Sequence, residues 1–376
     1  MKGTTNPLDI RITRLGVALE PAGDLEAEGT LNPAATLDRE GNLLLYPRDV
    51  ARGNQSRVGI VRVDYKEGDA IELKRLGFAL EPQAPYEIKG AGGEGCEDPR
   101  VTYIAALGLY LIAYTGYSSA GPRIAIAYSH DGYTWHRVGT VEFPRRLKLH
   151  PDDKDAAFFP EPVLSPRGVL SIAMYHRPMV PTPMTAGADE IQSVLANAAR
   201  ARQSIRIAYT PLEEVLKDIN ALTRPTESRL VMAPSSDWGS VKVGGGAAPV
   251  RIKEGWLSVY HGVDAIPKPG GGYQMRYSAG LVIHDARQPH RIVYRSKAPI
   301  LVPSTKEELE GTVNCVVFPT AVVPRSDLGE RVFDVYYGMA DFKIGRFRLE
   351  LANVLPERMW RSDRRGSGKK APRTRK

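Results

Sequence analysis

The sequence has little cysteine and no long apolar segment, and both absences limit what the protein can be. Its 376 residues include two cysteines, Cys96 and Cys315, which are too few for a disulfide framework. The most apolar segment, residues 101–114, is too short to cross a bilayer as a helix. The first 16 residues are mixed and polar, without the apolar core of a secretory signal. We therefore expect a protein of the reducing cytoplasm that has no membrane segment.

Several common catalytic signatures are also missing. There is no His-Glu-x-x-His helix for zinc and no Gly-x-Ser-x-Gly elbow for a nucleophilic serine. Glycines 244–246 could cradle a phosphate, but Lys242 precedes them and no Lys-Ser or Lys-Thr follows, so they do not form a P-loop. We expect neither a metal ion nor an organic cofactor.

The positive net charge of +8 is concentrated at one end of the chain. Residues 361–376 hold eight Lys or Arg and one Asp, so residues 1–360 are nearly neutral. Such a low-complexity basic segment is typical of disordered tails. No nucleic-acid recognition motif accompanies it. We therefore predict a folded domain over 1–360, a disordered tail over 361–376 and no specific nucleic-acid partner.

A repeated pair of strands indicates the fold. Each pair combines branched and aromatic residues with Gly, Asp or Pro in the turns, which is typical of β-structure. The five pairs are 42–50 with 57–65, 108–118 with 123–135, 169–178 with 204–212, 256–264 with 277–285, and 332–341 with 343–350. Five similar units in one chain predict an all-β, five-bladed β-propeller. An array of β-sandwiches is the alternative.

Helical signals are confined to one region. Residues 188–203 have apolar residues near helical spacing and no internal Pro or Gly. Residues 210–222 begin with Thr210, Pro211 and Glu213, the pattern of a capping box with proline at the first helical position. We predict a helical insertion near 188–222 that decorates the propeller.

Polar residues recur where the first strand of each pair ends. Taken singly, each position is an ordinary exposed strand end, but propeller closure would gather all five around one axis. These positions are Arg48, residues 115–117, His176 with Arg177, His261, and Asp341. Connecting loops add further polar candidates, namely Asn32, Lys154, Asp155, Glu161 and Lys242.

The stretch GGEGCEDPRV, residues 92–101, places two carboxylates side by side in a constrained loop. Pro99 fixes one backbone angle and favours an extended conformation at Asp98. The neighbouring glycines permit a sharp bend or a close approach to a ligand. By itself the stretch is equally compatible with a surface turn that holds a local pair between Asp98 and Arg100.

Eight motifs in order carry a resemblance to a known family. They are NPAA at 32–35, EDPRVT at 97–102, KDAAFFPE at 154–161, HRP at 176–178, KVGGGAAPV at 242–250, GWLSVYHGV at 255–263, VVFPTAVV at 316–323 and YYGMAD at 336–341. In these motifs the chain resembles the mannoside phosphorylases of glycoside hydrolase family 130. The family fold is a five-bladed propeller, in agreement with the repeat.

The resemblance implies roles for individual residues. It makes Asp98 the single general acid, and it assigns phosphate binding to Lys154, Arg177, Lys242 and His261. A phosphorylase needs no catalytic base, because phosphate is already an anionic nucleophile that cations hold in place. We also expect Glu97 to raise the pKa of its neighbour so that one carboxyl keeps a proton near neutral pH. Residues expected to bind the sugar are Asn32, Arg48, Glu97, Arg100, Asp155 and Asp341.

One position departs from the family pattern. Lys154 stands where family phosphorylases commonly carry arginine, so the charge is kept but the bidentate fork is lost. Family members that hydrolyse their substrates lack part of the cation set. All four cation positions are basic or can become so in this chain, which favours phosphorolysis.

We therefore predict an inverting phosphorylase of glycosyltransferase type that cleaves β-mannosides with inorganic phosphate to give α-mannose 1-phosphate. Its partners would be a manno-oligosaccharide or mannosyl disaccharide and phosphate, without a membrane. One rival is an inverting β-mannoside hydrolase, with Asp155 or Glu161 as base. The other is a non-catalytic sugar-binding propeller. The linkage, the acceptor sugar and any homo-oligomer stay open.

Overall fold

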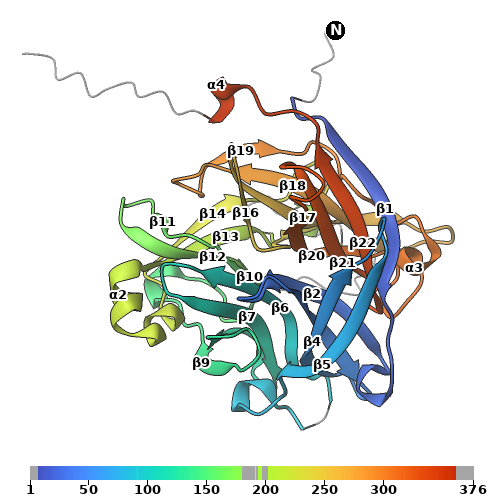
Figure 1. The fold of residues 1–376 in the computed structure, drawn as a ribbon, viewed down its shortest axis with the longest axis horizontal. Helices are drawn as coiled ribbons and strands as arrows, with labels where there is room; N and C mark the ends of the chain where they lie inside the picture. Colours follow the sequence, from blue (N-terminus) through green and yellow to red (C-terminus); the bar gives the residue numbers. More distant parts are fainter. Residues whose placement is uncertain (1–6, 91, 180–190, 192–193, 197–201, 361–376) are drawn as a thin grey trace, which may run out of the picture.

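The computed structural model describes residues 7–90, 92–179, 191, 194–196 and 202–360. These residues form antiparallel sheets around a common centre (Figure 1). The predicted all-β class is confirmed. Within the described residues no helix is long and apolar enough to cross a membrane. The predicted basic tail lies outside the described residues.

The largest sheet has eight strands and consists of two four-stranded units, which we call blades 1 and 2. They are linked by one short parallel contact, in which Gln55 pairs with Glu94 and Ser56 with Gly95. Blade 1 contains β2 (Gly29–Leu37), β3 (Leu43–Ala51), β4 (Gln55–Tyr65) and β5 (Ile71–Leu80). Blade 2 contains β6 (Glu94–Ile104), β7 (Leu109–Ser118), β8 (Gly121–Ser129) and β9 (His136–Thr140).

Three further sheets form blades 3, 4 and 5. Blade 3 contains β10 (Asp153–Phe158), β11 (Val163–Leu164), β12 (Leu170–Pro178), β13 (Ile205–Pro211) and β14 (Glu227–Met232). Blade 4 contains β15 (Lys242–Gly244), β16 (Val250–Ile252), β17 (Gly255–Pro267), β18 (Tyr273–His284) and β19 (Ile292–Arg295). Blade 5 contains β20 (Val317–Pro324), β21 (Val332–Met339), β22 (Lys343–Leu351) and β1 (Ile10–Leu19).

The blades close into a ring through the N-terminal strand and five apolar clusters. Strand β1 pairs antiparallel with β22, so the start of the chain completes the last blade (Figure 1). Each apolar cluster joins two consecutive blades, and the fifth packs Leu45 and Val61 of blade 1 against Val323 and Tyr336 of blade 5. The innermost strands β2, β6, β10 and β20 thereby lie next to one another around the centre.

All five predicted strand pairs are confirmed as hydrogen-bonded neighbours. They correspond to β3 with β4, β7 with β8, β12 with β13, β17 with β18, and β21 with β22. The strands of each pair pack between neighbouring blades and are largely buried on both faces, which explains why they are rich in branched and aromatic residues.

The helices are shorter than predicted. Ile191 and residues 194–196 are helical, and most of the first predicted helix lies outside the described residues. In place of a helix over 210–222, the structure has α2 (Leu212–Lys217) and a 3-10 helix over Ile219–Thr223. The capping box was wrong, because Thr210 pairs with Ile172 in the sheet and Pro211 precedes the helix without a side-chain cap. The remaining short helices are η1 (Asp24–Glu26), η2 (Pro85–Glu87), η3 (Arg145–Leu147), α3 (Lys306–Leu309) and α4 (Glu357–Trp360).

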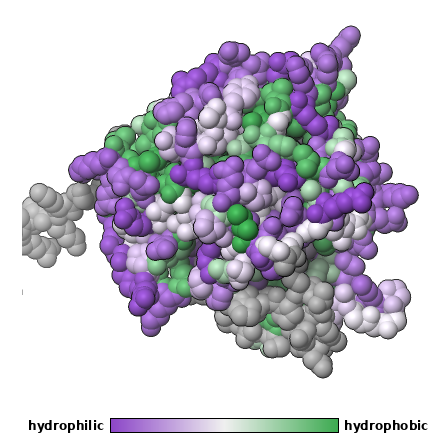
Figure 2. Space-filling view, turned by 90° about the horizontal axis from the view of Figure 1, so that it is seen from below, coloured by the Kyte–Doolittle hydropathy of each residue, from purple (hydrophilic) through white to green (hydrophobic). Residues whose placement is uncertain are grey.

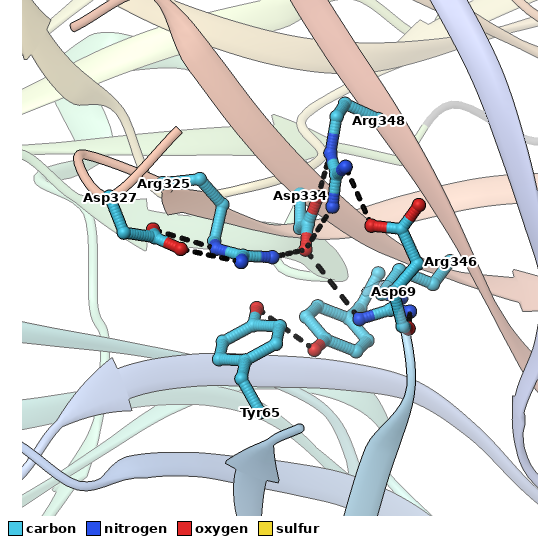
Figure 3. A network of polar contacts seen from close by, with 8 residues as sticks. Tyr65, Asp69, Arg325, Asp327, Asp334, Arg346 and Arg348 are labelled. Carbon is cyan, nitrogen blue, oxygen red and sulfur yellow. Dashed lines mark hydrogen bonds and ion pairs between the residues drawn. The ribbon is translucent and has the colours of Figure 1, made fainter. Parts of the chain in front are cut away.

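A network of charged side chains reinforces the junction where the ring closes (Figure 3). Asp334 of β21 is fully buried and accepts hydrogen bonds from Arg325 and Arg348, at 2.6 and 2.9 Å. Arg346 lies 3.6 Å from the same carboxylate. The ring of Tyr65 from blade 1 packs against Arg325, with 3.8 Å between the guanidinium carbon and the ring centroid. The face of the molecule seen in Figure 2 is mainly hydrophilic, with smaller hydrophobic areas.

Candidate active site

The innermost strands of three blades carry a β-bulge near their N-terminal ends, and a predicted site residue lies in each bulge. The pairing register shifts across Asn32 in β2, across Asp98 in β6 and across Asp155 in β10. These residues have positive φ angles of 46°, 47° and 59°, and Asp341, in the turn after β21, has 52°. Left-handed backbone at a non-glycine residue costs about 1–3 kcal/mol and is concentrated at functional sites. The bulges turn these polar side chains towards the centre of the ring.

Asp98 lies in a group of polar residues that hold its carboxylate from several sides. Its Oδ1 accepts a hydrogen bond from Asn32 Nδ2 at 2.9 Å and lies 3.4 Å from Arg48 Nη1. Arg48 also donates to Glu97 Oε1 at 2.9 Å, and Lys154 Nζ donates to Glu97 Oε2 at 3.1 Å. Residues from blades 1, 2 and 3 therefore converge on the two carboxylates. We call Asn32, Arg48, Glu97, Asp98, Lys154 and Asp341 the acid cluster.

Arg100 is fully buried and organises the loop behind Asp98. It donates to the backbone carbonyls of Asp98 and Pro99, both at 2.9 Å, and to the carbonyl of Gly246 in blade 4 at 2.5 Å. Its Nη2 has no hydrogen-bond partner among the described residues. Arg100 thus holds the backbone of the loop, and the predicted pairing with the Asp98 carboxylate is not its main contact.

The expectation that Glu97 keeps a proton on its neighbour was wrong for Asp98. Burial by itself would raise the pKa of Asp98, but the charges of Arg48, Arg100 and Lys154 and the hydrogen bond from Asn32 outweigh it, and the pKa lies below its ordinary value. The sequence placed a carboxylate beside Asp98 but did not reveal three cations around it. A raised pKa belongs instead to Asp341, which burial and the charge of Asp98 bring to about 6.

A second group, which we call the anion cluster, lies across blades 3 and 4 and consists of Asp155, Arg177, Lys242 and His261. Arg177 Nε donates to Asp155 Oδ2 at 2.5 Å, and the same oxygen lies 3.7 Å from His261 Nε2. Arg177 Nη1 also donates to Gln203. Asp155, Arg177 and His261 are each at least 95% buried. Asp155 therefore positions Arg177, one of the predicted phosphate ligands, and lies close to a second, His261.

The state of His261 corrects the prediction that four cations face the phosphate. Burial, together with the charges of Arg177, Lys242 and Arg100, lowers its pKa to about 3 despite the attraction of Asp155. The ring is therefore neutral near pH 7 and can donate one hydrogen bond and accept another. Neither ring nitrogen has a hydrogen-bond partner among the described residues. Two buried polar atoms without partners indicate a place for a polar ligand.

Aromatic residues that the sequence did not single out shape the anion cluster. Lys242 Nζ lies 5.0 Å from the ring centroid of Tyr277, and the His261 ring lies 4.4 Å from that of Phe318. Phe318 belongs to the VVFPTAVV motif, but the motif did not assign a role to its side chain. Tyr277 begins a predicted strand, and nothing in its sequence context marked it as part of a site.

The structure places ten of the eleven predicted site residues in the two adjacent clusters, and the eleventh, Arg100, lies between them. Arg100 joins them, since its charge acts on both Asp98 and His261. Lys154 was predicted to bind phosphate with Arg177, but its contacts place it with Glu97 in the acid cluster and over the ring of Tyr117 at 5.3 Å.

The two carboxylates considered as a hydrolytic base are unsuited to that role. Asp155 is buried in its ion pair with Arg177, and the charge of Arg177 and its hydrogen bond outweigh burial and hold the pKa of Asp155 far below the ordinary value. Glu161 is exposed. Its neighbour Pro160 lines a cavity with residues 101–103 and 320–324 from the C-terminal parts of β6 and β20, away from the bulges. Neither residue is arranged to activate a water beside the acid cluster.

A largely enclosed carboxyl group next to cations that can hold an anion characterises enzymes that protonate a leaving group while an anion attacks. Comparison with known proteins identifies which enzymes these are. Residues 8–357 match the model of glycoside hydrolase family 130, described as beta-1,4-mannooligosaccharide phosphorylase. The chain belongs to this family.

Individual relatives are consistent with this assignment. The chain is 28% identical over 336 residues to a 1,2-beta-oligomannan phosphorylase of Thermoanaerobacter sp. (strain X514), covering 88% of this chain and 92% of the relative. Among solved structures, it is similar to the β-1,2-mannobiose phosphorylase of Listeria innocua in complex with β-1,2-mannobiose, with a TM-score of 0.62 and 21% identity over 90% of this chain and 96% of that one. The chain is also similar to a solved structure described in connection with family 130 hydrolases that target β-1,2 mannosidic linkages in Candida mannan. The TM-score is 0.60 and the identity 21%, over 90% of this chain and 94% of that one.

Proposed function

We propose that this protein is an inverting β-mannoside phosphorylase, which transfers a mannosyl group to inorganic phosphate and so acts as a glycosyltransferase-type enzyme. A phosphate oxygen attacks the anomeric carbon, and the bond from that carbon to the glycosidic oxygen breaks. The leaving oxygen takes a proton from Asp98, directly or through a sugar hydroxyl. The products are α-mannose 1-phosphate and the shortened acceptor, and Asp98 is left as a carboxylate.

The single observation that carries this proposal is the anion cluster with its unpartnered polar atoms. Arg177 and Lys242 supply positive charge, and the neutral ring of His261 has both nitrogens free of partners among the described residues. Guanidinium and ammonium groups are the usual ligands of phosphate in proteins. A water molecule as nucleophile would need a base, and Asp155, the carboxylate within this cluster, is already paired with Arg177.

The low pKa of Asp98 makes its protonation depend on the bound ligands. Phosphate brings about two negative charges close to Arg100 and the acid cluster, and nearby negative charge raises the pKa of a carboxyl. A mannosyl group over Asp98 also excludes water and so favours the uncharged acid. Asp98 is therefore protonated most readily when both substrates are bound, so proton transfer depends on the binding of phosphate.

The acid cluster supplies the groups that would hold the mannosyl unit. Asn32, Arg48, Glu97 and Asp341 offer donors and acceptors for sugar hydroxyls, while Arg100 fixes the loop. We propose Lys154 as a bridge between the acid cluster and bound phosphate, since its ammonium group already lies beside Glu97. We further propose that the enzyme works in the cytoplasm and needs no metal or organic cofactor.

Turnover across a phosphate titration tests the proposal. Cleavage of β-1,2- and β-1,4-linked mannobiose should be negligible in phosphate-free buffer and should rise to saturation with phosphate. Equal turnover with and without phosphate would favour the hydrolase of the same fold. Saturable binding without turnover, under conditions in which the protein is folded, would favour the non-catalytic sugar-binding propeller.

A further inference from the structure

A second cavity lies next to the site, on the same end of the ring. Its volume is about 630 Å³, within the usual range for small-molecule sites. Its walls come from the segment between β5 and β6, the turn between β7 and β8, and the segment between β9 and β10. All three connections lie at the end of the ring where the bulges of β6 and β10 hold Asp98 and Asp155. The residues used below are Tyr86, Ser118, Ser119, Arg123 and Phe143.

Three walls of this cavity continue directly into the active site. Ser118 follows Tyr117, whose ring centroid lies 5.3 Å from Lys154 Nζ in the acid cluster. Arg123 pairs with Asp152, two residues before Lys154. Phe143 stacks on His176, the residue before Arg177, with 4.5 Å between the ring centroids and 18° between the planes. The cavity therefore adjoins both the acid cluster and the anion cluster.

The stacking of Phe143 gives the cavity a rigid aromatic wall. His176 beneath it is fully buried and is held by Asp153 and Ser228, each at 2.7 Å from one of its ring nitrogens. One face of Phe143 is thus fixed on an immobile ring, while the residue lines the cavity and is partly exposed. A fixed aromatic face beside hydroxyl groups and an arginine suits the apolar face and the hydroxyls of a pyranose ring.

We propose that this cavity is a distal subsite that binds the acceptor part of β-manno-oligosaccharides longer than a disaccharide. This inference rests on the proposed function, because it assigns the mannosyl group at the chain end to the acid cluster. A disaccharide would occupy the acid cluster and its immediate neighbourhood. Further sugar units would lie over Tyr117 and against Phe143, Ser118 and Ser119. Longer substrates therefore gain binding energy that a disaccharide cannot use.

The test compares substrates of two to five sugar units, in both linkages, on the full chain at saturating phosphate. In the wild type, kcat/KM should rise by roughly tenfold or more from disaccharide to tetrasaccharide. Ser119→Trp places a large side chain in the cavity from an exposed position and should abolish that rise while leaving disaccharide turnover unchanged. Ser326→Trp, at an exposed serine after β20, is the matched control and should behave as wild type. Phe143→Tyr should retain the preference, and Phe143→Ala should lose it.

The possible failures are distinguishable. If mannobiose is cleaved with phosphate but chain length has no effect, and Ser119→Trp matches Ser326→Trp, the subsite is wrong and the proposed function stands. If no mannoside is cleaved with phosphate, the proposed function fails, and calorimetric binding then decides the subsite by itself. Tighter binding of tetrasaccharide than of disaccharide, lost in Ser119→Trp, supports the cavity, and equal binding of the two overturns it.

Discussion

Arg177 and His261 share one carboxylate oxygen, Oδ2 of Asp155, at 2.5 and 3.7 Å. The carboxylate lies in a bulge of β10, while its two partners come from β12 and β17, in blades 3 and 4. The oxygen accepts a hydrogen bond from Arg177 and lies beside His261, and the packing of neighbouring blades brings the two groups together. It also offsets the charge of Arg177, so that the arginine can be buried without phosphate.

Arg177→Ala should raise the apparent Michaelis constant for phosphate by more than about tenfold, since truncating one partner of a buried ionic contact costs roughly 2–5 kcal/mol. The constant for the mannoside should change far less. Synthesis from α-mannose 1-phosphate should weaken in parallel, because it uses the same contacts. Steady-state kinetics with both substrates varied measures the two constants. Arg229→Ala, at an exposed arginine of the same blade, is the control.

The same variant also leaves Asp155 without its partner, so a loss of stability has to be separated from a loss of binding. Arg177→Ala combined with Asp155→Ala removes both charges and should regain melting temperature relative to Arg177→Ala. It should not regain phosphate affinity. Recovery of both properties in the double variant would mean that Arg177 is a structural partner of Asp155 and does not bind phosphate.

Asp98→Asn should lower kcat by about 10²–10⁴ on an unactivated disaccharide, because a positioned proton donor is lost. The amide can still accept the hydrogen bond from Asn32, so the fold should persist. Melting curves and kinetics, run beside Asp24→Asn at an exposed site, separate the two effects. Near-normal turnover by Asp98→Asn would remove Asp98 from the role of acid.

Asp341 gives the stability of the protein a particular pH dependence. Burial and the charge of Asp98 raise its pKa from 3.8 to about 6, so the folded state binds this proton more tightly than the unfolded state. The contribution to stability is fully present below about pH 4 and is lost as the pH rises through 6. As the pH rises between these limits, the unfolding free energy of Asp341→Asn should increase by about 1–2 kcal/mol relative to that of the wild type. The figure is kept small because the side chain retains some contact with solvent. Urea unfolding of both proteins from pH 4 to 7 measures this difference. If their unfolding free energies change with pH in the same way, the raised pKa is contradicted.

Asp334 and Asp327 provide a matched pair for the junction between blades 5 and 1. Both pair with Arg325, but the side chain of Asp334 is 0% exposed and that of Asp327 is 60% exposed. Asp334→Ala leaves buried guanidinium groups without a counter-charge and should cost about 3–5 kcal/mol of unfolding free energy. Asp327→Ala should cost less than about 1 kcal/mol. Equal losses in denaturant titrations would show that burial does not determine the strength of this network.

The fold was largely predictable because its strongest signals are local. The pairs β3–β4, β12–β13 and β17–β18 are rich in branched and aromatic residues and are largely buried, and Gly, Asp or Pro residues lie near their turns. Strand β1 was not predicted, because its partner β22 lies more than 300 residues away in sequence and no short turn connects the two strands. The short strands β15 and β16 are separated by glycines and a proline, so their pattern is too brief to recognise.

The residues of the site were predictable, but their electrostatics were not. The motifs named Asp98, Arg177 and His261, yet the low pKa of Asp98 and the neutral ring of His261 depend on which charges the blades bring within a few ångströms. The same holds for Lys154, whose nearest partner is Glu97 from a different blade. Such contacts follow from closure of the ring and leave no trace in the sequence near each residue.

The most direct test of the central claim, that an anion held beside Asp98 replaces water as the nucleophile, is the product formed during the first turnovers. Mannobiose is incubated with the wild-type protein and phosphate, and sugar phosphate and free mannose are followed by phosphorus and proton NMR. We predict one α-mannose 1-phosphate for each mannobiose cleaved, with one free mannose from the acceptor side and none beyond it. Two free mannoses for each mannobiose, without sugar phosphate, would contradict the account.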